Sequence, residues 1–161
     1  MLAYVFWHRP HEGTEPGNYE QAQLSFHAAL ETRSASFRLA ELPFADKDGY
    51  EDWYLVEDWE SLGKLNRAAV DSVRGPQHDR AALNAANGWG AVYALVRGPS
   101  SIPDVAHWLD KPRGEPSEEF IASLPETTIW QRQMVLGPGP EFCVTTPSPD
   151  GALRERIWPI P

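Results

Sequence analysis

Three segments of the chain, residues 2–9, 50–57 and 90–97, are apolar at both sets of alternating positions. In the first of them, Tyr4 and Phe6 alternate with Val5 and Trp7. A β-strand points successive side chains to opposite faces of its sheet, so a strand of this composition has to be covered on both faces. The sequence therefore predicts a sheet buried between two layers, and this requirement constrains the fold more than any motif in the chain.

The 15 prolines are distributed unevenly, with four in residues 1–97 and eleven in residues 98–161. Proline fixes φ and lacks a backbone donor, so the first part can hold long helices and strands and the second part is richer in loops. We predict a domain over residues 1–97 and a proline-rich extension over residues 98–161 that packs on it.

The hydrophobic pattern of the first part predicts a strand at 2–9, a helix at 18–32, strands at 36–42 and 50–57, and a strand at 90–97. Between the last two strands, Asp58 is a suitable N-cap for one helix, and Asn87-Gly88 is a suitable end for a second helix over 77–86. This βαββαβ order indicates an α+β fold with a ferredoxin-like antiparallel sheet and its helices on one face. Either a second copy of the chain or the extension must then cover the other face.

The extension has its own short elements. Residues 104–109 and 117–124 are expected to be short helices, and residues 129–136, 142–146 and 152–158 to form a strand meander. Isolated hairpins are marginal in water, so we expect this meander to lean on the first domain.

Charge and composition exclude several classes of function. The net charge is −9, and Lys and Arg do not cluster in a stripe, which argues against binding to nucleic acid. The chain has a single cysteine, no apolar run of membrane-spanning length and no recognisable leader at its start, which predicts a cytoplasmic protein without membrane association.

Three stretches, AYVFWHR, YLVEDWESLGKLNRAAV and GAVYALVRG, together resemble the dimeric α+β barrel superfamily in layout. That superfamily includes antibiotic-monooxygenase-like, ethyl-tert-butyl-ether-degradation-like and stress-responsive barrel proteins, and the resemblance covers residues 1–97. It implies a homodimer whose two sheets enclose a barrel, and a pocket for a small molecule. Members include cofactor-independent oxygenases and isomerases as well as heme proteins, and the resemblance carries no signature motif.

From these observations we expect a small-molecule protein that needs no cofactor, such as a monooxygenase or isomerase acting on an apolar or aromatic compound. A non-catalytic ligand-binding or interaction module is the alternative, and a heme- or metal-dependent protein of the same fold is the second. The residues leave open whether the chain is an enzyme.

His8 is the candidate for general acid–base catalysis, because an imidazole at the end of an apolar strand titrates in the useful range. The candidate substrate-binding residues come from both parts of the chain and are Tyr4, Trp7, His27, Tyr93 and Arg132. Each has an ordinary structural interpretation as a core aromatic, a residue beside an apolar helix stripe or a surface charge.

Other residues have the side chains needed for metal, heme, anion or thiol chemistry. His8, His11 and Glu12 have side chains that can bind a metal ion, and His27 could be an axial ligand of heme iron. His107, Lys111 and Arg113 could join Arg132 in an anion site. Cys143, between Phe142 and Val144, is expected to be a small core residue rather than a nucleophile.

Overall fold

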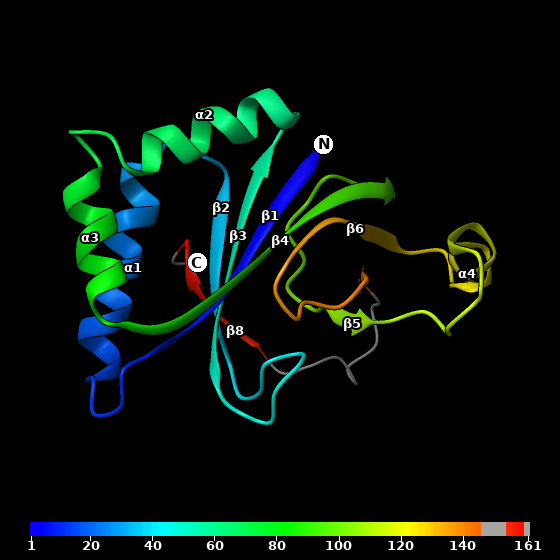
Figure 1. Ribbon diagram of the computed structural model, residues 1–161, viewed down its shortest axis with the longest axis horizontal. Helices are drawn as coiled ribbons and strands as arrows, with labels where there is room; N and C mark the ends of the chain where they lie inside the picture. The colour runs from blue at the N-terminus through cyan, green and yellow to red at the C-terminus, as the bar shows by residue number, and fades with distance from the viewer. Residues whose placement is uncertain (146–153, 160–161) are drawn as a thin grey trace.

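A computed structural model describes residues 1–145 and 154–159. Within these residues the chain has an α+β fold, in which an eight-stranded antiparallel sheet curls and four helices lie outside it (Figure 1). The elements in chain order are β1 (Leu2–Pro10), α1 (Pro16–Ala29), β2 (Ser34–Leu39), β3 (Gly49–Val56), α2 (Trp59–Ala69), α3 (Gly75–Leu83), β4 (Ala85–Arg97), β5 (His107–Leu109), α4 (Ser117–Ser123), β6 (Thr128–Leu136), β7 (Phe142–Thr145) and β8 (Arg154–Trp158).

The strands of the sheet follow the order β5-β7-β6-β4-β1-β3-β2-β8. The four strands from residues 1–97 are neighbours in the middle, where β1 pairs with β3 on one side and with β4 on the other. The extension adds strands at both sides of this group, because β6 pairs with β4 and β8 pairs with β2. The sheet is thus continuous across the proline-rich boundary.

One face of the central strands is covered by helices. Helix α1 contacts β2 and β8, α2 contacts β1 and β3, and α1 and α3 lie side by side (Figure 1). Asp58 caps α2 as predicted, since its Oδ1 accepts a hydrogen bond of 2.8 Å from the backbone N–H of Ser61. In this view α1, α2 and α3 lie at one end of the molecule, and β5, β6 and α4 lie at the other.

The other face is covered by the extension. Its residues Ala106, Trp130 and Cys143 form one buried cluster with Val5 and Trp7 of β1. The extension therefore supplies the second layer that strands apolar on both faces require, and that face is buried without a second copy of the chain.

Several of the expected elements are wrong or shifted: the first helix is Pro16–Ala29 and not 18–32, and the second strand is Ser34–Leu39 and not 36–42. Residues 104–109 are not a helix, because His107–Leu109 pairs with β7 as strand β5. The second helix of the first part ends at Leu83 and not at Asn87-Gly88, since Asn87 and Gly88 pair with Arg9 and His8 as part of β4. The last strand is Arg154–Trp158, and residues 152 and 153 of the expected strand lie outside the described residues.

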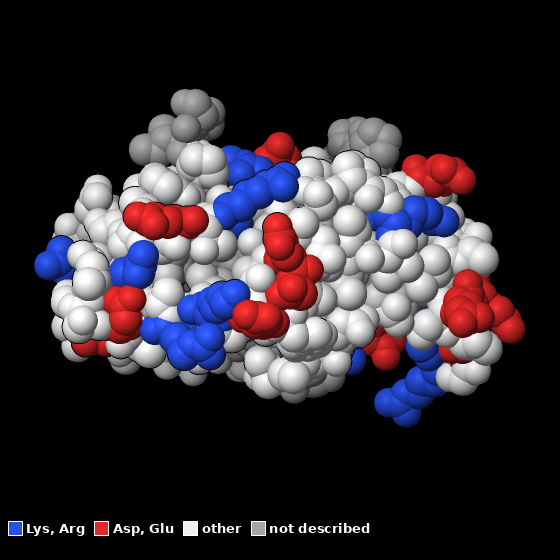
Figure 2. Space-filling view, turned by 90° about the horizontal axis from the view of Figure 1, so that it is seen from above, with Lys and Arg blue, Asp and Glu red and all other residues white. Residues whose placement is uncertain are grey.

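Within the described residues no helix is both long and apolar enough to cross a membrane. On the face seen in Figure 2, basic side chains stand next to acidic ones rather than in a continuous stripe.

The turn between β6 and β7 provides a test of how the extension packs. A Cβ at Gly139 would lie 2.8 Å from Cζ3 of Trp7 and 3.2 Å from the Tyr93 hydroxyl. Gly139→Ala is expected to lower the free energy of unfolding by about 1–3 kcal/mol, because overpacking forces buried rings to move. Urea unfolding followed by circular dichroism measures this.

Gly17→Ala is the matched control, because a Cβ at Gly17 would meet nothing within 4 Å and alanine favours α1, whose second residue is Gly17. Equal stability of the two variants would contradict the packing of this turn on Trp7.

Candidate functional site

A polar cluster is buried between the sheet and α1. It consists of His8, Asp52 and His27, whose exposed fractions are 1, 1 and 2%. The register of the sheet brings the first two together, because Phe6 pairs with Asp52 and His8 with Tyr50, so that Asp52 lies diagonally across from His8 on the same face. Helix α1 places His27 over that face.

The Asp52 carboxylate lies between the two imidazoles. Its Oδ2 is 3.1 Å from His8 Nε2, and its Oδ1 is 3.2 Å from His27 Nε2. The hydroxyl of Tyr54 donates a further hydrogen bond of 3.2 Å to Oδ2. One buried anion thus faces two histidines and a tyrosine.

The other nitrogen of each imidazole is held as well. His8 Nδ1 lies 2.5 Å from the Tyr19 hydroxyl, and His27 Nδ1 lies 2.9 Å from Ser34 Oγ. The polar groups therefore form a chain that runs from Tyr19 through His8, Asp52 and His27 to Ser34. Both imidazoles are fixed in orientation by partners on α1 and β2.

The electrostatics of this chain keep the anion charged and the phenols neutral. Burial alone would raise the pKa of the Asp52 carboxyl, but attraction to His8 and His27 and their hydrogen bonds hold it well below its usual range. Burial and then the Asp52 charge raise the pKa of Tyr19 and Tyr54 far above the usual value. At neutral pH, Asp52 is an acceptor and the two tyrosines are donors.

A row of five stacked rings connects the cluster to the surface. Its members, in order along the sheet face, are Tyr54, Tyr4, Phe6, His8 and Tyr50, with neighbouring ring centroids 5.5–6.1 Å apart. Tyr4 and Phe6 are partly exposed, whereas the other three rings are buried. The row thus offers a flat aromatic surface to a ligand, with the imidazole of His8 one ring away.

The structure separates the site residues that were predicted together. Tyr4, His8 and His27 lie on the helix-covered face. Trp7 and Tyr93 lie on the opposite face. There Trp7 Nε1 donates a hydrogen bond of 2.9 Å to Glu51, and the Tyr93 hydroxyl donates one of 2.8 Å to the carbonyl of Pro140.

Arg132 lies beside Tyr93, its register partner in β4. It donates to the carbonyl of Gly139 and faces the carboxylate of Glu141 at 3.9 Å. Glu141 also accepts a hydrogen bond from the backbone N–H of Lys111. Its carboxylate therefore already lies between Arg132 and Lys111, where the predicted anion site would bind its ligand.

The remaining candidates are placed as follows. His11 and Glu12 are exposed in the turn after β1, whereas His8 is buried. Across residues 1–145 and 154–159, no group of three His, Cys, Asp or Glu is arranged to hold a metal ion. Cys143 is a buried core residue, and burial raises the pKa of its thiol well above the usual value.

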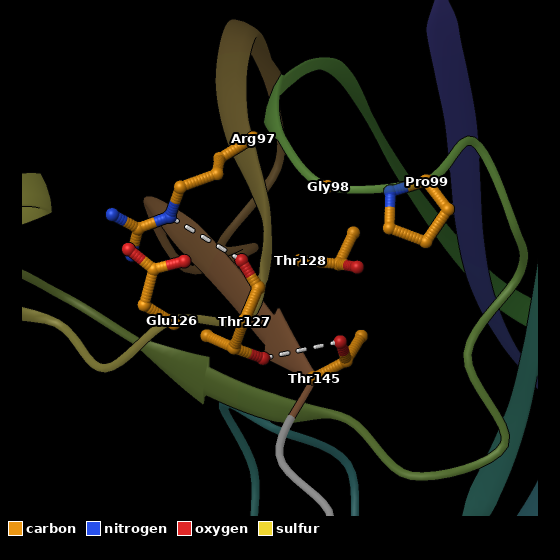
Figure 3. Close-up of a pocket in the computed structure, with 7 residues that line it drawn as sticks. All are labelled: Arg97, Gly98, Pro99, Glu126, Thr127, Thr128 and Thr145. Atoms are coloured by element: carbon orange, nitrogen blue, oxygen red, sulfur yellow. Dashed lines mark hydrogen bonds between the residues drawn. The ribbon is translucent and has the colours of Figure 1, made fainter.

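A pocket of about 360 Å³ opens elsewhere, near the ends of β4, β6 and β7 (Figure 3). It is lined by Arg97, Gly98, Pro99, Glu126, Thr127, Thr128 and Thr145. The guanidinium of Arg97 donates to the carbonyls of Leu124, Pro125 and Thr127, and the hydroxyls of Thr127 and Thr145 lie 3.3 Å apart. No predicted site residue lines this pocket, and its arginine is already engaged by the backbone.

The sequence interpretation missed Asp52 and Tyr19. Their roles depend on tertiary contacts, but one signal for Asp52 is present in the chain. Glu51 and Asp52 are two consecutive acids in a strand that is otherwise apolar on both faces, so each has to be buried with a partner.

No protein-family model, curated protein or solved structure matches this chain. The site is therefore interpreted from its own geometry.

Replacing the central anion tests the cluster. Asp52→Asn is expected to lower the free energy of unfolding at pH 7 by about 3–5 kcal/mol, because it removes one partner of a buried ionic group. Thermal and urea unfolding measure the loss. Asp48→Asn is the matched control, since the Asp48 side chain is 81% exposed in its pair with Arg9.

The pH dependence has a defined sign. The folded-state pKa of Asp52 is lowered from 3.8, so its contribution is complete above about pH 4 and is lost as the pH falls below that value. The wild-type protein should lose more stability than Asp52→Asn between pH 5 and pH 2. Parallel stability curves would contradict this account.

Proposed function

We propose that the protein is a small-molecule enzyme that moves protons on an apolar or aromatic, carbonyl-bearing compound, with His8 as the acid–base residue. The observation that carries the proposal is the hydrogen-bonded chain Tyr19–His8–Asp52, which lies one ring behind the partly exposed Tyr4 and Phe6. Isomerisation and cofactor-independent oxygenation both begin with the removal of a proton from such a substrate.

Binding is assigned to the aromatic surface of Tyr4 and Phe6. Both rings lie over glycines of β4, where a Cβ at Gly90 would be 2.7 Å from the Tyr4 hydroxyl. The glycines let the rings lie flat on the sheet, so a planar ligand can stack on them. A ligand on this surface reaches His8 when the Phe6 ring turns aside.

Proton transfer is assigned to Nδ1 of His8. The ionised Asp52 can only accept a hydrogen bond, so the imidazole proton of His8 lies on Nε2, which faces it. Nδ1 then accepts the hydrogen bond from the Tyr19 hydroxyl. When the substrate displaces the Tyr19 hydroxyl from Nδ1 and gives this nitrogen a proton, the imidazolium that forms is stabilised by Asp52. An isomerase returns this proton to another atom of the same substrate.

The sheet order supports the ferredoxin-like part of the proposal. Strands β1 and β2 are joined by α1 and run in the same direction with β3 between them, as in the split βαβ plan. The extension takes the place that a second sheet has in the dimeric α+β barrel proteins. A homodimer remains a proposal, and sedimentation velocity tests it.

A non-catalytic ligand-binding module is the second candidate. It is favoured by the burial of His8, Asp52 and His27, and by the Phe6 ring, whose centroid stacks 5.6 Å from that of His8. In that case the cluster orients the aromatic surface and transfers no proton.

Deuterium exchange at the α-carbon of 2-tetralone, followed by NMR in D₂O, separates the two functions. The wild-type protein is expected to accelerate the exchange, and His8→Gln to reduce the acceleration about 100-fold. His78→Gln is the matched control, because His78 lies on α3 with 38% of its side chain exposed and its Nδ1 faces the exposed carboxylate of Asp79, which is not part of the buried cluster. Its exchange rate should equal that of the wild type.

Saturable binding of 2-tetralone without accelerated exchange would favour the binding module. Acceleration that survives His8→Gln would contradict the role of His8.

A further inference from the structure

The interior face of the sheet holds a second buried anion, Glu51 of β3. Its carboxylate is fully buried and accepts hydrogen bonds from three indole N–H groups, at 2.9 Å from Trp7, 2.7 Å from Trp53 and 2.9 Å from Trp108. The fourth donor is Nη1 of Arg154, which forms an ion pair with Oε1. The three indoles fix the position of the carboxylate, and Arg154 supplies its positive charge.

The guanidinium of Arg154 is enclosed on several sides. Its Cζ lies 3.8 Å from the centroid of the Phe37 ring and 6.0 Å from a Trp53 ring. Its Nε donates 3.0 Å to the backbone carbonyl of Asp104. The Arg154 side chain is 1% exposed, and its Nη2 is buried without a hydrogen-bond partner among residues 1–145 and 154–159. A carboxylate, a carbonyl and an aromatic face together match the planar, multiply donating shape of a guanidinium group.

The strand that carries this guanidinium is attached at the edge of the sheet. Within the described residues strand β8 pairs with β2 and packs on α1, where Trp158 lies beside His27. Its Arg154 and Arg156 side chains also reach Asp104. The carboxylate and two of its indole donors, by contrast, belong to the central strands β1 and β3. The receptor part of the contact is therefore built independently of the strand that fills it.

We propose that Glu51, Phe37 and the carbonyl of Asp104 form a guanidinium-binding site, which Arg154 occupies as an intramolecular ligand. The ligand class is a guanidinium group on an alkyl stem, carried either by a small molecule or by an arginine of a polypeptide. In the wild-type chain the tethered guanidinium of Arg154 has an effective concentration in the millimolar range. A free guanidinium ligand of equal affinity therefore displaces it only when its own concentration is higher than that. The site lies on the opposite face of the sheet from His8 and is independent of the proposed enzyme activity.

Arg154→Ala tests the proposal, with methylguanidinium chloride as the probe and the melting temperature as the readout. The variant should melt below the wild type, and methylguanidinium should raise its melting temperature saturably, by about 3–6 °C at tenfold excess over the dissociation constant. The same concentration of sodium chloride should not. Arg67→Ala is the matched control and should not respond, because Arg67 lies exposed on α2 and Arg154 still fills the site in that variant.

The double variant Glu51→Gln/Arg154→Ala should lose the response, because the carboxylate that holds the guanidinium is gone. An acetyl-Gly-Arg-Gly amide peptide distinguishes the two sources of ligand: tighter binding than methylguanidinium points to a polypeptide arginine, and weaker binding to a small molecule. A folded Arg154→Ala that shows no saturable response, or a response that survives in the double variant, would overturn the proposal. Should Arg154→Ala fail to fold, refolding with methylguanidinium must recover it, and no recovery would equally overturn the proposal.

Discussion

The buried carboxylate of Glu51 holds the two ends of the curled sheet together. Its four donors come from β1, β3, β5 and β8, and the last two are the edge strands of the sheet. Within the described residues β5 pairs with β7 and β8 pairs with β2, and the two edge strands do not pair with each other. The side chains that donate to Glu51 therefore link the two edges. An ionised carboxylate in the interior is costly without such partners, so moving either edge strand away leaves it short of a donor. The contacts of Glu51 therefore favour the arrangement in which both edge strands lie against the central strands.

The next residue in β3, Asp52, makes the corresponding contacts on the other face. Consecutive residues of a strand point to opposite sides, so Glu51 is directed toward the face that the extension covers and Asp52 toward α1. Every residue of β3 is buried, which fits a strand that carries one anion on each face. The position of Asp52 between His8 and His27 thus depends on the same strand that Glu51 anchors. The contacts that link the sheet edges and the geometry of the candidate site are therefore coupled through β3.

Much of the fold could be predicted from hydrophobic pattern. The strands β1, β3 and β4 are long and apolar on both faces, which identified them and the need for a second layer. Pattern alone did not show that residues 107–109 are a strand, because three residues are too few for a period and their state is decided by pairing with β7. Asn87-Gly88 has the composition of a helix end, but pairing with β1 extends β4 through it.

The candidate site was predictable in part. His8 and His27 are unusual enough in apolar segments to be noticed, whereas Asp52 and Tyr19 gain their roles from strand register and helix placement. Trp7 and Tyr93 were grouped with His8 as aromatic walls of one pocket. Alternation along β1 is enough to place Trp7 on the opposite face from His8, whereas the face of Tyr93 follows only from its register opposite Ala3.

The coupling of the two sheet edges through Glu51 can be measured most directly by hydrogen exchange of the indole N–H groups, followed by NMR. The account predicts that Trp7, Trp53 and Trp108 exchange with one common opening free energy, equal to that of global unfolding. Trp59, which is 50% exposed, should exchange rapidly and serves as the internal reference. If Trp108 exchanged far faster than Trp7 and Trp53, the extension would open separately from the central strands, and the central role given to Glu51 would be wrong.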